Sequence, residues 1–248
     1  TSSAADTSSA ADTSSAADTS SAADSSSAAL TGTSSSKLYV LGGYKGAYEL
    51  AKNIEVFDGT TWTVEADLEA NYRHGAGCVV LNNIIYIIGG RDSNQQIRDT
   101  VNTYDPATKT WSAAVNMITK REFPGCVVYN GNIFVLGGYN GNSLRSVEKY
   151  DPSTNSWTEV GTLLGYVYEC VLLSDNKIYG VQGGSKVQIY DPETNVATQS
   201  VSNVPLGLGY FPVAAVLNDH LHILGQHTFL DRFVKYNHLT DSWTDEPD

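Results

Sequence analysis

The stretch RHGAGCVVLNNIIYIIGG, residues 73–90, contains the pattern that decides the fold of this chain. Two apolar runs of strand length stand on either side of a short turn, and the second run ends in a glycine pair. Nearly continuous apolar runs of this length are typical of strands covered on both faces. The pattern returns as KREFPGCVVYNGNIFVLGG, residues 120–138, so the hairpin is one unit of an internal repeat.

The repeat extends to five copies. Each has a strand-like run, usually ending in glycine, then an alternating run that closes on an aromatic residue, then a turn that usually leads to Trp. The closing aromatics follow one another at intervals of 47, 46, 40 and 46 residues: Phe57, Tyr104, Tyr150, Tyr190 and Tyr236. A period of roughly 40–50 residues with four short strands per unit predicts the blades of a β-propeller.

This order of strand, Gly-Gly, Tyr-Asp and Trp resembles the kelch repeat, and the resemblance covers residues 37–248. It implies an all-β, kelch-type propeller of about five blades and, most often in that family, a protein-binding role. The first copy begins at Lys37 with its second strand. We therefore expect a first blade that lacks its inner strand, with residues 1–36 as a separate low-complexity tail.

The cysteines recur at one position of the repeat: Cys78, Cys126 and Cys170, with Ala214 in the last copy. We expect small buried side chains near the crowded axis rather than a nucleophile or a metal ligand, since free Cys behaves as a small hydrophobe. Their odd number argues against a disulfide framework. The glycine pairs are expected to permit sharp turns and close backbone approach.

The longer loops, which join the second strand to the third and one blade to the next, are expected to share one face. Binding residues tend to lie on such loops over a rigid scaffold, and exposed Tyr and Arg are enriched at binding surfaces. Arg73 and Arg121 occupy equivalent positions, so for them a role as struts between blades is an equal alternative. The candidate binding residues are Tyr44, Tyr48, Tyr72, Arg73, Arg91, Arg98, Arg121, Tyr139, Asn140, Arg145 and Tyr166.

Composition argues against several other classes. The net charge of −12 disfavours nucleic acid as a partner, and no apolar run approaches the length of a membrane span. His220, His222 and His227 could form a metal site, but no carboxylate or Cys ligand is placed beside them, and His222 aligns with core aromatics. No catalytic triad or phosphate loop is found. We therefore predict a protein that is not an enzyme and has no metal or cofactor.

The tail begins with TSSAAD written four times, residues 1–24. Ser, Thr, Ala and Asp bury too little to offset the entropy of ordering. The Ser/Thr density resembles that of stretches carrying O-linked sugars. The candidate acceptors are Thr1, Ser2, Ser3, Thr7, Ser8, Ser9, Thr13, Ser14, Ser15, Thr19, Ser20 and Ser21.

Two functions remain open from the sequence. The first is an extracellular filament subunit, in which the tail of one copy docks on the propeller of the next. An unfilled strand position is a template for strand addition, and head-to-tail contacts generate open polymers. In the second, a cytoplasmic adaptor, the loop face binds a protein or peptide. The tail favours the filament and the family resemblance favours the adaptor; our sequence-based hypothesis is the filament.

Overall fold

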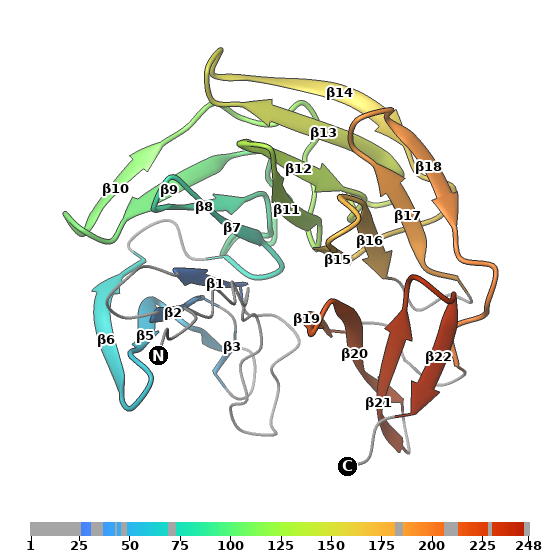
Figure 1. The fold of residues 1–248 in the computed structure, drawn as a ribbon. Coiled ribbons are helices and arrows are strands. Elements are labelled where there is room, and N and C mark those ends of the chain that lie inside the picture. Colours follow the sequence, from blue (N-terminus) through green and yellow to red (C-terminus); the bar gives the residue numbers. More distant parts are fainter. Residues whose placement is uncertain are drawn as a thin grey trace, which may run out of the picture.

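Five antiparallel four-stranded sheets surround a central axis in the computed structural model (Figure 1). The structure describes residues 26–30, 37–42, 44–45, 49–68, 73–181, 186–205, 213–227 and 230–245. Every regular element in these ranges is a β-strand. The predicted all-β propeller of about five blades is thus confirmed. Over the same ranges, no helix has the length and apolar character needed to cross a membrane.

Each sheet is a meander in which successive strands pair, with the inner strand nearest the axis. Blade 1 contains β1 (Ser26–Leu30), β2 (Lys37–Leu41), β5 (Asn53–Phe57) and β6 (Trp62–Asp67), and its long loop carries the short β3 (Tyr44–Lys45) and β4 (Glu49–Leu50). Blade 2 contains β7 (Gly77–Leu81), β8 (Ile84–Ile88), β9 (Val101–Asp105) and β10 (Thr110–Ala113). Blade 3 contains β11 (Gly125–Tyr129), β12 (Asn132–Leu136), β13 (Ser146–Asp151) and β14 (Ser156–Thr162). Blade 4 contains β15 (Glu169–Leu172), β16 (Ile178–Val181), β17 (Gln188–Asp191) and β18 (Val196–Gln199). Blade 5 contains β19 (Val213–Leu217), β20 (His220–His227), β21 (Leu230–Asn237) and β22 (Ser242–Asp245).

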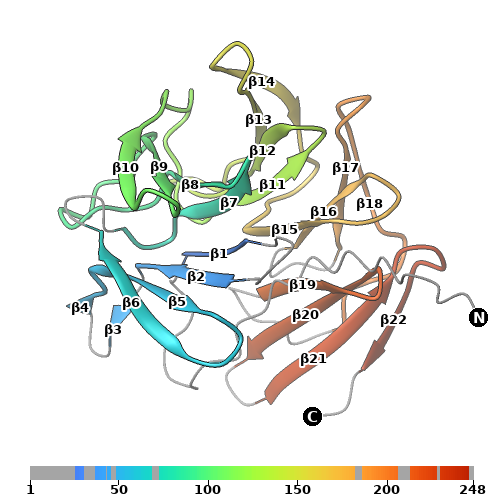
Figure 2. The same ribbon diagram turned by 60° about the vertical axis from the view of Figure 1, so that its left-hand side comes forward.

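The expectation that blade 1 lacks its inner strand is wrong. Ser26–Leu30 pairs antiparallel with β2 in the register Ser26↔Leu41 to Leu30↔Lys37, and Figure 2 shows β1 alongside β2. The strand comes from the segment expected to be a tail. Pairing of this kind uses backbone N–H and C=O groups, which even a Ser/Ala sequence can supply. The template that an unfilled strand position would offer to another copy is therefore occupied by the chain itself.

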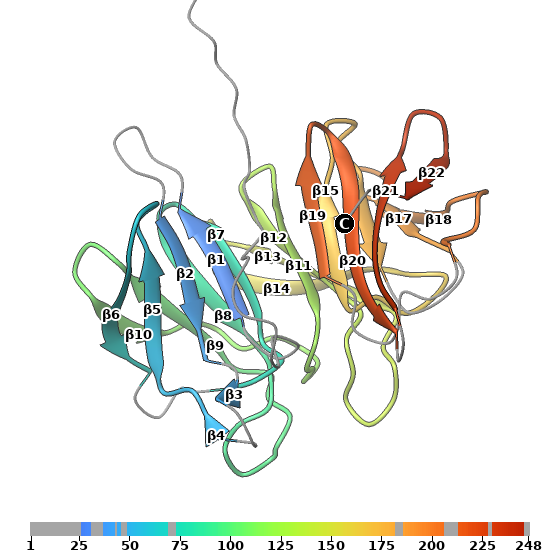
Figure 3. The same cartoon turned by 90° about the horizontal axis from the view of Figure 1, so that it is seen from below.

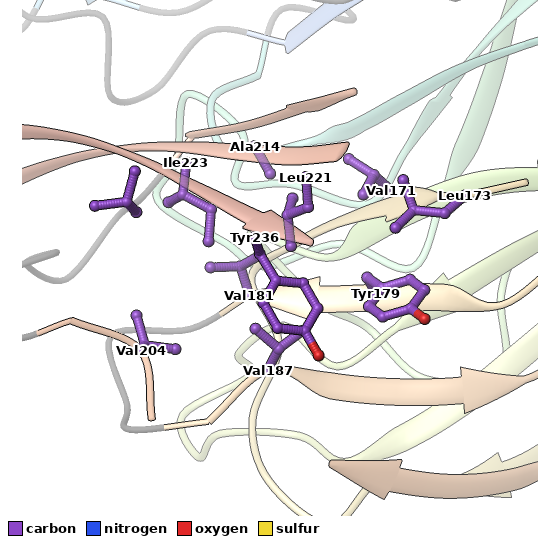
Figure 4. Close-up of a cluster of buried hydrophobic side chains, with 11 residues drawn as sticks. Val171, Leu173, Tyr179, Val181, Val187, Val204, Ala214, Leu221, Ile223 and Tyr236 are labelled. Carbon is purple, nitrogen blue, oxygen red and sulfur yellow. The ribbon is translucent and has the colours of Figure 1, made fainter. Parts of the chain in front are cut away.

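The hydrophobic core lies in the seams between blades. Side chains alternate along each strand, so one set faces the preceding blade and the other faces the next. In the seam between blades 4 and 5, Tyr179 and Val181 pack against Leu221, Ile223 and other residues of the facing sheet (Figure 4). Each blade consequently supplies two apolar faces, which is why its strands carry nearly continuous apolar runs.

Close backbone approach at the described glycines of the glycine pairs ties blades 1, 2 and 3 to the loop that enters the next blade. Gly137 has φ of +62°, and a Cβ built there would lie 2.5 Å from the carbonyl oxygen of Val167. Gly138 donates its N–H to that same carbonyl at 2.8 Å. Only glycine fits this combination of left-handed backbone and contact with a neighbouring main chain. The role expected for these pairs is confirmed at Gly137.

The inner strands contact one another in the order β1, β7, β11, β15 and β19. Among the described residues, no comparably close contact joins β19 back to β1. The face of blade 5 on this side exposes three apolar side chains: Val213, Leu217 and Leu224.

Candidate functional site

The meander topology places two kinds of loop on one face of the propeller. The loops joining second to third strands and those joining one blade to the next both emerge there, whereas the tight hairpin turns emerge opposite. In Figure 3 this loop face lies at the lower edge, where β3 and β4 are seen. We refer to it as the loop face.

Arg121 crosses the seam between blades 2 and 3. Its backbone N–H donates to the carbonyl of Arg98 at 3.0 Å, and its own carbonyl accepts from Gly90 at 2.8 Å. Its guanidinium enters blade 3, where it donates to the carbonyl of Gly137 at 2.6 Å and pairs with the Glu148 carboxylate. The side chains of Arg121 and Glu148 are both fully buried.

Arg73 makes the corresponding bridge into blade 2. Its guanidinium donates to the carbonyls of Gly89 and Thr100, both at 2.9 Å, and to the side-chain oxygen of Asn102. Burial lowers its pKa to about 10, which leaves it charged at neutral pH. Arg73 and Arg121 are thus packed as struts, the alternative considered for them, and neither is accessible enough to belong to the candidate binding surface.

The other predicted arginines lie on the loop face with varied partners. Arg91 donates twice to Glu122, at 2.7 and 2.5 Å, which joins two adjacent loops. Arg98 pairs with Asp92 inside its own loop, with Nε at 2.7 Å from the carboxylate. Arg145 is exposed, and its Nη1 donates to the carbonyl of Leu164 at 3.3 Å.

The remaining predicted residues divide into described and undescribed positions. Tyr166 is 47% exposed, while Tyr139 and Asn140 are partly buried. The Tyr139 backbone exchanges two hydrogen bonds with Glu122, at 2.8 and 2.9 Å. Tyr48, Tyr72 and the side chain of Tyr44 lie outside the described residues, as do all the candidate O-glycosylation positions between Thr1 and Ser21.

The structure adds two residues that were missed in the sequence, Ile118 and Leu164. They are 57% and 53% exposed and hold equivalent positions in the loops on either side of blade 3, directly after the buried Met117 and Leu163. The sequence does indicate them, because each of these loops has two consecutive apolar residues and the core buries only the first of the two. We refer to these two residues and Tyr166, all exposed on the two loops that flank blade 3, as the loop patch.

Buried side chains hold the backbone of the loop patch in place. The Glu148 carboxylate accepts the N–H groups of Ile118 and Thr119, at 2.8 and 3.0 Å. In the next seam the Gln188 side chain accepts the N–H of Gly165 at 2.9 Å. The exposed apolar side chains are therefore presented from loops whose conformation is already fixed, which lowers the entropy lost on binding.

Candidate chemistry beyond contact surfaces is sparse in the described part of the chain. No three His, Cys, Asp or Glu side chains gather there as metal ligands. The His222 ring stacks on Phe233 with centroids 5.5 Å apart, so it packs as its alignment with core aromatics suggested; the side chain of His227 is not described. The three cysteines are free thiols, and burial raises the pKa of Cys78 to about 12.

Comparison with protein families adds to this geometry. The model of the KLHDC2/KLHL20/DRC7 Kelch-repeats domain matches residues 5–184. The chain belongs to the kelch-repeat family. The matched residues include β1 of the kelch propeller, in agreement with its place in blade 1.

The individual kelch relatives described below are 26–33% identical to this chain. The chain is 33% identical to Kelch-like protein 23 of Pongo abelii over 195 residues, 73% of this chain and 34% of the relative. It is 29% identical to Kelch-like protein 25 of Xenopus tropicalis over 200 residues, 73% of this chain and 33% of that relative. An F-box/kelch-repeat protein of Arabidopsis thaliana is 26% identical over 173 residues, 65% of this chain and 40% of the relative. The kelch propeller thus spans about a third of the length of the first two.

Proposed function

We propose that this protein is a non-enzymatic kelch adaptor whose loop face binds a segment of another protein. The observation that carries the proposal is the loop patch, in which Ile118, Leu164 and Tyr166 expose about half of their surface on loops with a fixed backbone. Rigid apolar and aromatic side chains at the centre of a contact supply most of the binding energy at protein interfaces.

The filament hypothesis has lost its main physical support. It needed an inner strand position for the tail of another copy, and Ser26–Leu30 of the same chain fills that position. Self-association, O-linked sugars and an extracellular or cytoplasmic location remain predictions from the sequence. The adaptor function depends on none of them.

Selection from a library of random 12-residue peptides tests the proposed function. We expect the wild-type protein to enrich peptides that contain apolar residues. The variant Ile118→Ser/Leu164→Ser/Tyr166→Ser should bind the same peptides at least about tenfold more weakly, because one lost hot-spot contact already costs more than about 1.4 kcal/mol.

A matched control is available on the opposite face. Leu239 lies in a hairpin turn and is 81% exposed, so Leu239→Ser removes a comparable apolar side chain without touching the loop face. It should leave peptide binding unchanged. Failure to enrich any peptide, or equal losses in the control and the triple variant, would contradict the proposed function.

A further inference from the structure

Glu169 stands where blades 2 and 3 have glycine. It is the first residue of β15 and pairs with Val181, as Gly77 pairs with Ile88 in blade 2 and Gly125 with Leu136 in blade 3. This position follows directly on the loop that enters the blade. It therefore lies beside the axis at the end that opens on the loop face.

The inner strands show why a large side chain fits in the seam between blades 4 and 5. In the seams between blades 2 and 3 and between blades 3 and 4 the glycine makes room for a cysteine of the next blade, since a Cβ on Gly125 would lie 2.8 Å from the Sγ of Cys170. In blade 5 the corresponding position is Ala214, which pairs with Ile223 as Cys170 pairs with Gly180. The smaller Ala214 leaves the space that the Glu169 side chain can occupy.

The Glu169 carboxyl group has little to stabilise a negative charge. Among the described residues it accepts one hydrogen bond, from the N–H of Cys170 at 3.1 Å, and it takes part in no ion pair there. The charge of Glu169 acts on two thiols, Cys126 and Cys170, which are neutral, and the described β19 residues are apolar. Burial raises the pKa of Glu169 to about 7, and the residue as a whole keeps part of its surface exposed.

Resting on the proposed function, we propose that Glu169 is a subsite for a cationic nitrogen, a lysine ammonium or an arginine guanidinium, carried by the protein segment that binds the loop face. A carboxylate without a cationic partner in a partly desolvated position gains most from such a group. Arg121 acts electrostatically on the same thiol as Glu169, that of Cys126, but its charge is already paired with Glu148. The bound segment supplies the missing partner.

Proton linkage follows from this assignment. A cation that binds only the ionised carboxyl group must displace its proton, so its affinity rises as the carboxyl ionises. Between pH 6 and pH 8 the ionised fraction of a group with pKa about 7 rises about tenfold. Affinity for a permanently charged ligand should rise by about the same factor.

The test uses n-butylammonium chloride as the probe, with sodium chloride at equal ionic strength as its control. The titration midpoint of Glu169 is followed by carbon NMR of its side-chain carboxyl, assigned by its absence in Glu169→Gln. We expect butylammonium at about ten times its Kd to lower the midpoint by about one pH unit, and sodium to leave it unchanged. The peptide selection is repeated at pH 8 with wild type, Glu169→Gln and, as a matched control, Glu159→Gln on the exposed surface of β14.

The outcomes separate this inference from the proposed function. The subsite is supported by two results together. The midpoint shifts, and wild type and Glu159→Gln enrich peptides with Lys or Arg whereas Glu169→Gln does not. An unchanged midpoint overturns it, even where peptides still depend on the loop patch. A shifted midpoint with peptides that lack basic residues overturns the claim that the bound segment supplies the cation. A shifted midpoint with no enriched peptide leaves the cation site standing and contradicts the proposed function.

Discussion

Replacing Arg121 with valine tests how the seams between blades are held together. Arg121→Val removes the ion pair with Glu148 and the hydrogen bonds to the carbonyls of Gly137 and Ser146, at 2.6 and 3.4 Å. Glu148 stays fully buried without its cation, although the N–H groups of Ile118 and Thr119 still reach it. Removing one partner of a buried pair costs about 3–5 kcal/mol, so we expect that loss in the free energy of unfolding.

Blade 4 suggests a second substitution that should restore part of the stability lost in Arg121→Val. At the positions of Arg121 and Glu148 it carries Val167 and Gln188, and the amide accepts the loop N–H without any charge. The double variant Arg121→Val/Glu148→Gln copies this arrangement. It should recover at least about 2 kcal/mol relative to Arg121→Val, because no ionised group is then left buried.

Glu148→Gln alone copies the pairing seen in blade 2, where Arg73 donates to the neutral side chain of Asn102. Arg121 keeps its carbonyl acceptors in this variant. We therefore expect an intermediate cost of about 1–3 kcal/mol, the range for weakening a charged hydrogen bond.

Urea denaturation at 25 °C, followed by tryptophan fluorescence and circular dichroism, measures all three variants. A total stability of about 5–15 kcal/mol is typical of a domain and leaves room to resolve these differences. A loss below about 1 kcal/mol in Arg121→Val, or a double variant no more stable than that single one, would refute the idea that Arg121 neutralises a buried charge.

Three further results are expected. Gly137→Ala should destabilise by at least about 2 kcal/mol more than Gly131→Ala, because both glycines have positive φ but only the first would press a Cβ against a neighbouring backbone; equal costs in urea melts would contradict this. The folded state holds the Glu169 proton more tightly than the unfolded chain, so wild-type stability falls as pH rises from about 4.5 to 7. The Tm of Glu169→Gln should therefore exceed that of wild type by a margin that grows between pH 5 and pH 8. A Tm difference that stays constant with pH would argue against a raised pKa. Cys78, with its raised pKa, should stay unlabelled by iodoacetamide at pH 7.5 in the folded protein and react once unfolded, as mass spectrometry can show.

The sequence by itself determined the repeating hairpins, the number of blades and the small residues near the axis. These features depend on contacts within about fifty residues, and five copies report the same pattern, so a weak local signal is repeated until it is unambiguous. The position that tolerates only small side chains was readable for the same reason: Cys78, Cys126, Cys170 and Ala214 fall in register.

Only the tertiary structure decided which loop residues are accessible and what completes blade 1. Arg121 and Arg145 look alike in the sequence, but one lies buried in a seam and the other on the surface, because burial depends on what the next blade places opposite. Ser26–Leu30 gave no strand signal, since its pairing with β2 uses backbone groups that every residue has. Contacts made by the main chain and between blades leave little mark on residue type, and for that reason they appear only once the sheets are arranged around the axis.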